Sequence, residues 1–461
     1  MKAVLGYLSA ATLLLGGCAT DGQSPASPSP TASVRSALAS VSSDVSEASL
    51  RGYIEKMVSF GTRHTLSDQV SDTRGIGAAR RWVESEFRKM SSDCGNCLEV
   101  ITVQDTVTAP PRVPNPTVVA NAVAIQRGTG DPNRVIIIQG HLDSRVTDVM
   151  NFAADAPGAN DDASGVAAVM EAARILSKRK FGATLVFAAL SGEEQGLHGG
   201  RILAAHAKAQ GWEVLAVLNN DIVGNSHGMA AHIDDRVRVF SEGVRSNESE
   251  AIAAARRSVG GEVDAPSRNL ARYVDAIAEA HMPSFDVSMV YRRDRFSRGG
   301  DQVPMVEAGF PAVRVTEAAE HYHRQHQDLR TENGIVYGDT IEGVDFPYLA
   351  RVTKLNAMTM ASLASAPRPP REVKIDGAVS ANTTVTWAAS EGAASYIVWW
   401  RETTSPVWQH SKLVSGATTT VLENTVIDDW FFGVQAVSAE GYASPVQFAG
   451  VVGAFFPPAA K

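Results

Sequence analysis

Short apolar segments alternate with helix-patterned segments through the middle of the chain, and this alternation restricts the fold most. Residues 134–140 (RVIIIQG) are rich in β-branched side chains, as expected for a buried strand. Residues 163–179 follow with apolar side chains at helical spacing, and further strands are expected at 183–190 and 311–317. Strands that alternate with helices form a parallel sheet covered on both faces. The pattern predicts an α/β domain whose mostly parallel mixed sheet is flanked by helices.

Two segments with unusual composition divide the chain. Residues 19–40 are rich in Ser, Pro, Ala and Thr and are predicted to be a tether. The proline-containing residues 365–372 are predicted to be a stiff linker, which bounds the α/β domain at 41–364. Residues 373–455 show short alternating strands without a helical pattern, which indicates an all-β sandwich. The placing of Trp387, YIVWW and FFGVQAVSAEG resembles a fibronectin type III domain.

The first residues have the pattern of an export signal. In residues 1–18 a lysine is followed by an apolar run and then by small residues, as in a signal peptide. The LGGC that ends at Cys18 resembles a bacterial lipobox, which implies lipid on the Cys18 thiol; the alternative is an ordinary signal peptide. Because Ala19 follows, the resemblance favours the outer membrane. We expect an exported protein, either an outer-membrane lipoprotein or a periplasmic or extracellular one, with membrane contact through this anchor.

Charge and cysteine content exclude two classes of function. The net charge is −8 without a long basic run, which argues against nucleic acid as the main partner. Cys94 and Cys97 form a C-x-x-C pair, and the sequence has no second pair to complete a structural zinc site. In an exported protein the pair is expected to form a structural disulfide that closes a turn.

Polar side chains follow several predicted strands, where ligand sites form in open α/β sheets. They are His141, Asp143, Asp161, Asp162, Glu193, Glu194, Asp221, His321, His323 and His326. Asp162, just before a helix, is expected to cap it. Imidazoles and carboxylates without a thiolate suit zinc, with manganese or cobalt as alternatives. The strand ends supply five candidate ligands: one His, one Asp, one Glu, one Asp and one His. Five ligands are more than one catalytic zinc uses, and they suit two ions that share a carboxylate.

A centre with two metal ions would explain why two glutamates stand side by side. A water that bridges two ions loses a proton near neutral pH. One glutamate can bind metal while its unligated neighbour receives that proton as general base. The pair at Glu193 and Glu194 is therefore interpreted as a ligand and a base side by side.

The motifs GHLDS, PGANDDASG, SGEEQG, NND and a late YH resemble, in this order, those of the secreted bacterial di-zinc aminopeptidases. Their co-catalytic zinc exopeptidase family also includes glutamate carboxypeptidases and glutaminyl cyclases, and the resemblance covers about residues 45–360. It implies two Zn²⁺ ions per chain, with the metal ligands His141, Asp161 (bridging), Glu194, Asp221 and His323. It also implies Glu193 as general base, Asp143 as the carboxylate that orients His141, and Tyr322 as a phenol that polarises the scissile carbonyl.

The sequence departs from the family pattern in two places. The family often has an Asp four residues after the last ligand His, but Gln327 stands there and Asp328 comes one later. His326 is therefore a rival to His323. The family also commonly has Asp-His near its amine pocket, where this chain has Asp301 followed by Gln, so Asp301 is a candidate for binding the substrate's amino group.

The expected function is an exported zinc aminopeptidase that hydrolyses N-terminal residues from peptides. A carboxypeptidase or dipeptidase is one alternative, with the substrate carboxylate bound by the run that contains Arg292, Arg293, Arg295 and Arg298. A single-zinc glutaminyl cyclase is another. A cell-surface binding module is the third, and it would depend on residues 367–461, whereas we expect the peptidase core to keep its activity on small substrates without them.

Overall fold

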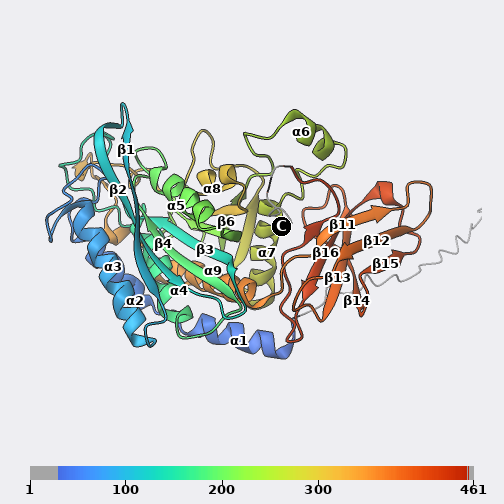
Figure 1. The fold of residues 1–461 in the computed structure, drawn as a ribbon. Coiled ribbons are helices and arrows are strands. Elements are labelled where there is room, and N and C mark those ends of the chain that lie inside the picture. The colour runs from blue at the N-terminus through green and yellow to red at the C-terminus, as the bar shows by residue number, and fades with distance from the viewer. Residues whose placement is uncertain (1–29, 454, 456–461) are drawn as a thin grey trace, which may run out of the picture.

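The computed structural model describes residues 30–453 and 455, which form an α/β domain with an all-β domain beside it (Figure 1). The α/β domain is built on an eight-stranded mixed sheet of order β1-β2-β4-β3-β5-β8-β6-β7. Its four central strands are mutually parallel: β4 (Ala183–Leu190), β3 (Asp131–His141), β5 (Glu213–Asn220) and β8 (Ala312–Glu317). The outer strands are β1 (Glu99–Ala109), β2 (Val113–Gln126), β6 (Arg236–Ser241) and β7 (Asp286–Val290). The predicted fold class is confirmed.

Helices cover both faces of the sheet. One face carries α1 (Ala32–Ser43), α2 (Glu47–Val58), α3 (Gly75–Asp93), α4 (Ala163–Leu176), α7 (Pro266–His281) and α9 (Phe346–Ser365). The other face carries α5 (His198–Ala209) and α8 (Gln302–Ala308), and α6 (Glu250–Arg257) lies at the periphery (Figure 1). In β3, Ile136 and Ile138 pack into the first layer while Val135 and Ile137 pack into the second. The apolar run of this strand is thus explained by burial on both sides.

Helix α1 begins inside the segment predicted to be a tether. Val34, Leu38 and Val41 form a buried stripe at helical spacing, and the Thr31 hydroxyl caps the helix by accepting from the Val34 N–H at 3.3 Å. The Ser- and Ala-rich composition concealed this stripe, so the prediction of a tether up to residue 40 is wrong from Ala32 onward. The signal segment and Cys18 lie outside the described residues.

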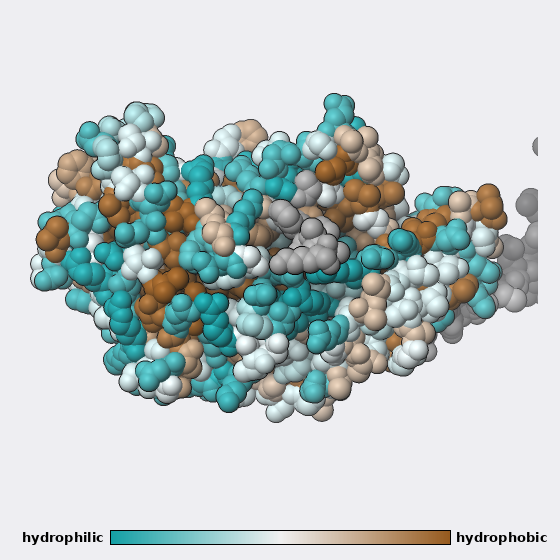
Figure 2. Space-filling view, in the orientation of Figure 1, coloured by the Kyte–Doolittle hydropathy of each residue, from teal (hydrophilic) through white to brown (hydrophobic). Residues whose placement is uncertain are grey.

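Among the described residues, no helix has both the length and the apolar character needed to cross a membrane. On the face seen in Figure 2, hydrophobic residues lie in separate groups among hydrophilic ones.

The all-β domain consists of two antiparallel sheets. One contains β11 (Arg371–Asp376), β12 (Thr383–Ala388) and β15 (Thr419–Leu422). The other contains β14 (His410–Ser415), β13 (Ser395–Glu402), β16 (Trp430–Val437) and β17 (Gln447–Phe448). Trp387, Val398 and Phe432 are buried together in its core. The all-β prediction is confirmed, while the fibronectin type III assignment stays a prediction.

The linker between the domains is attached to the sheet. Arg368 within it forms ion pairs with Asp131 at the start of β3 and with Glu213 at the start of β5. Arg134 on β3 also donates to the backbone carbonyl of Ala366 in the linker. The linker therefore fixes the all-β domain against the edge of the sheet opposite to the carboxyl ends of the parallel strands.

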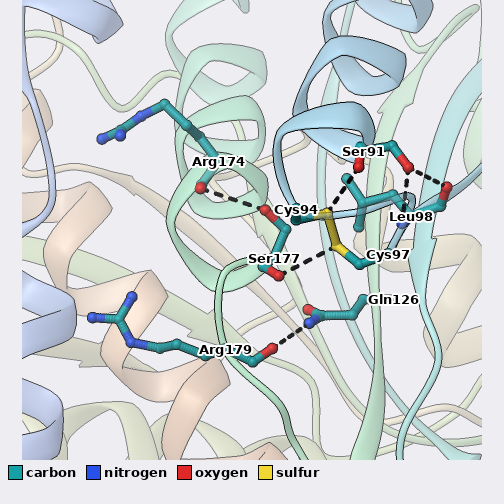
Figure 3. The surroundings of a disulfide bond; sticks show 8 residues. All are labelled: Ser91, Cys94, Cys97, Leu98, Gln126, Arg174, Ser177 and Arg179. Atoms are coloured by element: carbon teal, nitrogen blue, oxygen red, sulfur yellow. Dashed lines mark hydrogen bonds between the residues drawn. A yellow bond between two sulfur atoms is a disulfide. The ribbon is translucent and has the colours of Figure 1, made fainter.

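Cys94 and Cys97 are joined by a disulfide at the end of α3 (Figure 3). Beside it, the Ser91 hydroxyl donates to the Leu98 carbonyl at 2.8 Å and accepts from the Leu98 N–H at 3.1 Å. The prediction of a structural disulfide that closes a turn is confirmed.

Candidate metal centre

The ends of the parallel strands bring the predicted ligands to one rim of the sheet. β3 ends at His141, β4 is followed by Glu194, and β5 is followed by Asp221. Asp161 lies in the loop before α4, and His326 lies in a series of turns after β8. Except for His326, which is half-buried, these side chains are buried.

The side chains form two groups of donor atoms that share one carboxylate. In the first group, His141 Nε2 lies 3.1 Å from Asp161 Oδ1 and 3.8 Å from Asp221 Oδ1. In the second, His326 Nε2 lies 2.9 Å from both Asp161 Oδ2 and Glu194 Oε1. The donor atoms of each group are close enough to hold one metal ion. Because Asp161 offers one oxygen to each group, its position is that of a bridging ligand.

The last histidine differs from the one preferred on the sequence. His326 completes the second group, whereas among the described residues His323 belongs to neither group and packs on Tyr337 with 4.8 Å between ring centroids. The prediction of His323 as the last metal ligand is therefore corrected to His326, its rival on the sequence. His326 reaches the site from a left-handed backbone conformation (φ 52°), a local feature that the YH motif did not reveal. Tyr322 is 59% exposed, and its proposed role stays a prediction.

Asp143 orients the first histidine and the glutamate pair. The Nδ1 of His141 lies 2.9 Å from the Asp143 carbonyl and 3.6 Å from its carboxylate. A proton on Nδ1 that is donated to this carbonyl leaves the lone pair on Nε2, which faces Asp161. The Asp143 carboxylate accepts the backbone N–H groups of Glu193 at 3.2 Å and Glu194 at 3.1 Å. One residue thus orients a ligand and holds the backbone of both glutamates.

The loop that carries Asp161 is held by backbone hydrogen bonds to two carboxylates. Asp339 accepts the N–H of Asp161 at 2.7 Å. Asp162 accepts the N–H groups of His141 at 2.9 Å, Gly165 at 3.0 Å and Ile222 at 3.1 Å. The expectation that Asp162 caps the helix is confirmed, and its carboxylate also joins the ends of β3 and β5.

Two arginines that the sequence reasoning missed contact the candidate ligands. Arg314 on β8 is fully buried and donates from Nη2 to Asp221 Oδ1 at 2.7 Å. Arg145 donates from Nε to Glu194 Oε2 at 2.8 Å. The sequence did carry a signal for Arg314, which is a cation in the centre of the apolar strand PAVRVTE. An arginine is rarely fully buried without a partner, so this position indicates a buried acidic partner. The sequence offered no comparable signal for Arg145.

The electrostatics distinguish the bridging aspartate from the neighbouring glutamate. Burial raises the pKa of Glu193 well above its usual range, with Glu194 adding to the effect and His141 opposing it. Burial also acts to raise the pKa of Asp161, but the facing imidazoles of His326 and His141 hold that pKa well below its usual range. Asp161 therefore stays ionised, as a bridging ligand must.

The donor set fits divalent cations. Three carboxylates and two imidazoles converge at the site, and a metal charge offsets the repulsion among buried carboxylates. Imidazole and carboxylate together suit zinc.

Two further sequence predictions concern substrate recognition. Asp301 is 1% exposed; its Oδ1 accepts the Gly200 N–H at 3.1 Å, and its buried Oδ2 has no hydrogen-bond partner among the described residues. In the basic run, Arg293 pairs with Glu242, Arg295 pairs with Asp294 and Glu320, and Arg298 lies 3.5 Å from Glu320. Three of the arginines considered for a substrate carboxylate are thus occupied by acidic side chains of the protein.

Comparison with known proteins agrees with the site. Residues 121–337 match the model of peptidase family M28. A probable zinc metalloprotease of Leptosphaeria maculans is 46% identical over 88% of this chain and 95% of its own length. One of Pyrenophora teres f. teres is 45% identical over 88% of this chain and 85% of its own. The LapA aminopeptidase of Legionella pneumophila shares the fold, with a TM-score of 0.51 and 19% identity over 72% of this chain and 75% of that one. The chain therefore belongs to peptidase family M28 and is a zinc metallopeptidase.

Proposed function

We propose that the chain is an aminopeptidase that removes N-terminal residues from peptides with two zinc ions. His141 and Asp221 would hold one ion, Glu194 and His326 the other, and Asp161 would bridge them. The observation that carries the proposal is that Asp161 Oδ1 faces His141 Nε2 at 3.1 Å while Asp161 Oδ2 faces His326 Nε2 at 2.9 Å.

Glu193 is the proposed general base. When bound, paired zinc ions polarise a scissile carbonyl and activate a water for attack on it. Among the described residues Glu193 belongs to neither donor group, although its neighbour Glu194 belongs to one. The Asp143 carboxylate fixes its backbone at the rim through the N–H of Glu193. Its raised pKa suits a carboxylate that accepts a proton from water and returns it to the leaving amine.

Asp301 is the proposed partner of the substrate's amino group. Burial raises the pKa of the Asp301 carboxyl to about 7; His141 opposes this shift, and Asp143 and Asp221 add to it, as expected for a carboxyl near the centre. The free Oδ2 is an acceptor without a donor among the described residues, and a substrate ammonium supplies such a donor. A carboxypeptidase needs a free cation instead, and the ion pairs of Arg293 and Arg295 argue against one.

Substrate pairs that differ only at the amine test this function. Zinc-loaded protein is assayed on aminoacyl p-nitroanilides, their N-acetylated forms and peptides with blocked N-termini, with zinc counted per chain. We expect two zinc ions and cleavage only when the amine is free. Asp301→Asn should lower kcat/KM for these substrates by about 10- to 100-fold, the worth of one charge-assisted hydrogen bond. Asp286→Asn, at an exposed position, is the control.

Other outcomes identify the alternatives. Cleavage of peptides with a blocked N-terminus from their carboxyl end would replace the aminopeptidase by a carboxypeptidase. One zinc per chain, with cyclisation of N-terminal glutamine and no hydrolysis, would identify a glutaminyl cyclase.

We also propose that the protein acts after export, attached through Cys18. The signal-like residues 1–18 and the LGGC motif support this, as does the Cys94–Cys97 disulfide, which is typical of oxidising compartments. Labelled palmitate should be incorporated into wild-type protein in growing cells and not into Cys18→Ser. Equal labelling of the two would contradict the anchor.

A further inference from the structure

A third group of ligand-type side chains lies away from the zinc centre. His227, His232 and Asp345 bring one nitrogen or oxygen atom each within 4.8 Å of one another. Both histidines are exposed and Asp345 is half-buried. Neither the family resemblance nor the proposed peptidase chemistry uses any of them.

The local backbone places the two imidazoles together. Residues 226–233 form a small hairpin in which the Ile233 N–H donates to Ser226 O and the Gly228 N–H donates to Ala231 O, both at 2.9 Å. His227 and His232 face each other between these bonds. This is a non-hydrogen-bonded antiparallel pair, the arrangement in which facing side chains come closest. Their rings stack with 3.9 Å between centroids and 16° between planes.

Asp345 faces the hairpin from the start of α9, where hydrogen bonds hold it in place. It is the N-cap of α9, where its Oδ1 accepts the Tyr348 N–H at 3.1 Å, and its own N–H donates to Gly224 O at 2.7 Å. The Ser226 hydroxyl donates to Asp345 Oδ2 and lies 3.1 Å from His227 Nδ1. Since that hydroxyl has only one proton, His227 Nδ1–H must be the donor to Ser226. The lone pair of His227 is then on Nε2, one of the two nitrogens through which a neutral imidazole can bind metal.

We propose that His227, His232 and Asp345 form a third, surface metal site that binds one zinc or similar transition-metal ion. Two neutral imidazoles select such an ion over calcium or magnesium, and an exposed site leaves water to complete the coordination. Stacked imidazoles repel each other when both are protonated, whereas one ion joins both neutral rings. The ion would fasten the hairpin that follows Asp221 to the start of α9, and so stabilise the fold without taking part in peptide hydrolysis.

Cobalt separates this site from the zinc centre. Full-length protein is titrated with zinc only up to the smallest amount that gives maximal peptidase activity, and zinc is counted per chain so that any zinc already held at the third site is recorded. Co²⁺ is then titrated while its visible absorption and the melting temperature are recorded. We expect one additional Co²⁺ per chain, with the visible d–d bands of an imidazole-containing site, and a higher melting temperature. The His227→Ala/His232→Ala variant should lose the band, the additional ion and the temperature shift.

Two further variants guard against misfolding and non-specific binding. Asp345→Asn keeps the helix cap, since Asn caps as well as Asp, but removes a charged ligand. Loss of a residue that merely hydrogen-bonds a metal ligand costs about 10–100-fold in metal affinity, so this variant should weaken cobalt binding at least as much. His410→Gln, in the all-β domain, should bind cobalt like wild type. All the variants should keep the peptidase activity of the zinc-loaded protein.

The proposal is overturned by either of two results. One is that wild type binds no more metal ions per chain, zinc and Co²⁺ counted together, than the double-alanine variant. The other is that the double-alanine variant binds the additional Co²⁺ with the wild-type affinity and spectrum. Because the readout is the additional ion and not hydrolysis, failure of this proposal is distinct from failure of the proposed aminopeptidase function.

Discussion

Arg314 Nη2 lies 2.7 Å from Asp221 Oδ1, so a fully buried guanidinium is paired with a carboxylate of the proposed zinc centre. The other end of the guanidinium donates to Asp294 at 2.9 Å. Burial would raise the pKa of Asp221, but Arg314 and His141 together lower it below its usual value. Arg314 therefore keeps this ligand ionised before any metal binds.

Arg314→Met should unfold more easily than wild type. The substitution keeps most of the side-chain volume but leaves Asp221 and Asp294 without their shared partner. Removal of one member of a buried ion pair costs about 3–5 kcal/mol, and urea denaturation of the metal-free proteins measures this loss. The control is Arg351→Met, whose partner Asp234 is 47% exposed and whose loss should cost less than about 1 kcal/mol. Equal losses in the two variants would contradict the structural role of Arg314.

Glu193→Gln should lose catalysis and keep metal. The variant removes the proposed base without removing a ligand, and kcat should fall by about 10²–10⁴-fold, the usual contribution of a general base. Glu194→Gln is the matched control, because it alters the neighbouring carboxylate that lies 2.9 Å from His326 Nε2 and should lower zinc content. Zinc is counted per chain beside steady-state rates. If Glu193→Gln loses zinc while Glu194→Gln keeps it, the two roles are reversed.

His326→Ala should lose one zinc ion, and His323→Ala should keep both. His326 lies 2.9 Å from two carboxylate oxygens of the centre, while the ring of His323 packs on Tyr337. Zinc content after dialysis against a weak chelator and kcat on a free-amine substrate distinguish the variants. Zinc lost from His323→Ala alone would return the ligand assignment to the residue preferred on the sequence.

The parallel core and most of the candidate site could be predicted because their signals are local. His141, Glu194 and Asp221 each follow an apolar strand directly, and parallel strands necessarily end at the same edge. Asp161 was recognisable from its motif before a helix. The last histidine was not, because it lies in irregular turns, where a left-handed residue decides which imidazole reaches the centre. The periodicity of the sequence does not indicate a turn conformation of this kind.

Long-range partners were equally hard to foresee. The composition of residues 19–40 suggested a tether, yet Val34 and Leu38 are buried against the domain in α1. The linker at residues 365–372 gave no sign that Arg368 would pair with Asp131 and Glu213. Such contacts depend on where remote segments meet, and one sequence without periodic signals does not define that.

The all-β domain should contribute to the stability of the peptidase domain. Asp264 is fully buried between Arg272 of its own domain at 3.0 Å and Arg401 of the all-β domain at 2.7 Å. Tyr273 also donates to Ala443 O at 3.0 Å across the interface. Removal of residues 367–461 would expose these groups, so the expectation that the core works unchanged without them needs a direct test.

Arg401→Met should destabilise the full chain and leave its zinc centre intact. Loss of one partner of a buried charge costs about 3–5 kcal/mol, which calorimetry of the zinc-loaded protein detects as a lower melting temperature. The kcat on small substrates at low temperature should match wild type, because Arg401 lies in the all-β domain and pairs with Asp264. The control is Lys412→Met, an exposed change in the same domain. A melting temperature equal to that of wild type would mean that the interface carries little stability.

Asp275 on α7 should make stability decrease as pH rises. Burial, with Glu279 and Asp286 nearby, raises the pKa of Asp275 to about 7. Since its folded pKa lies above its unfolded value, the folded state holds this proton more tightly, and stability falls as pH rises from about 4 to about 7. Asp275→Asn should therefore match wild type near pH 4 and exceed it above pH 7 by on the order of 2–4 kcal/mol.

Urea denaturation of wild type and Asp275→Asn across this pH range measures the difference, and Asp376→Asn, at an exposed position in the all-β domain, is the control. The difference between wild type and Asp275→Asn should grow through the window between the two pKa values and then level off, because above the folded pKa the carboxyl is ionised in both states. A difference that is constant with pH would show that Asp275 titrates with its ordinary pKa. A difference of opposite sign would mean that an undetected cation stabilises the ionised carboxylate.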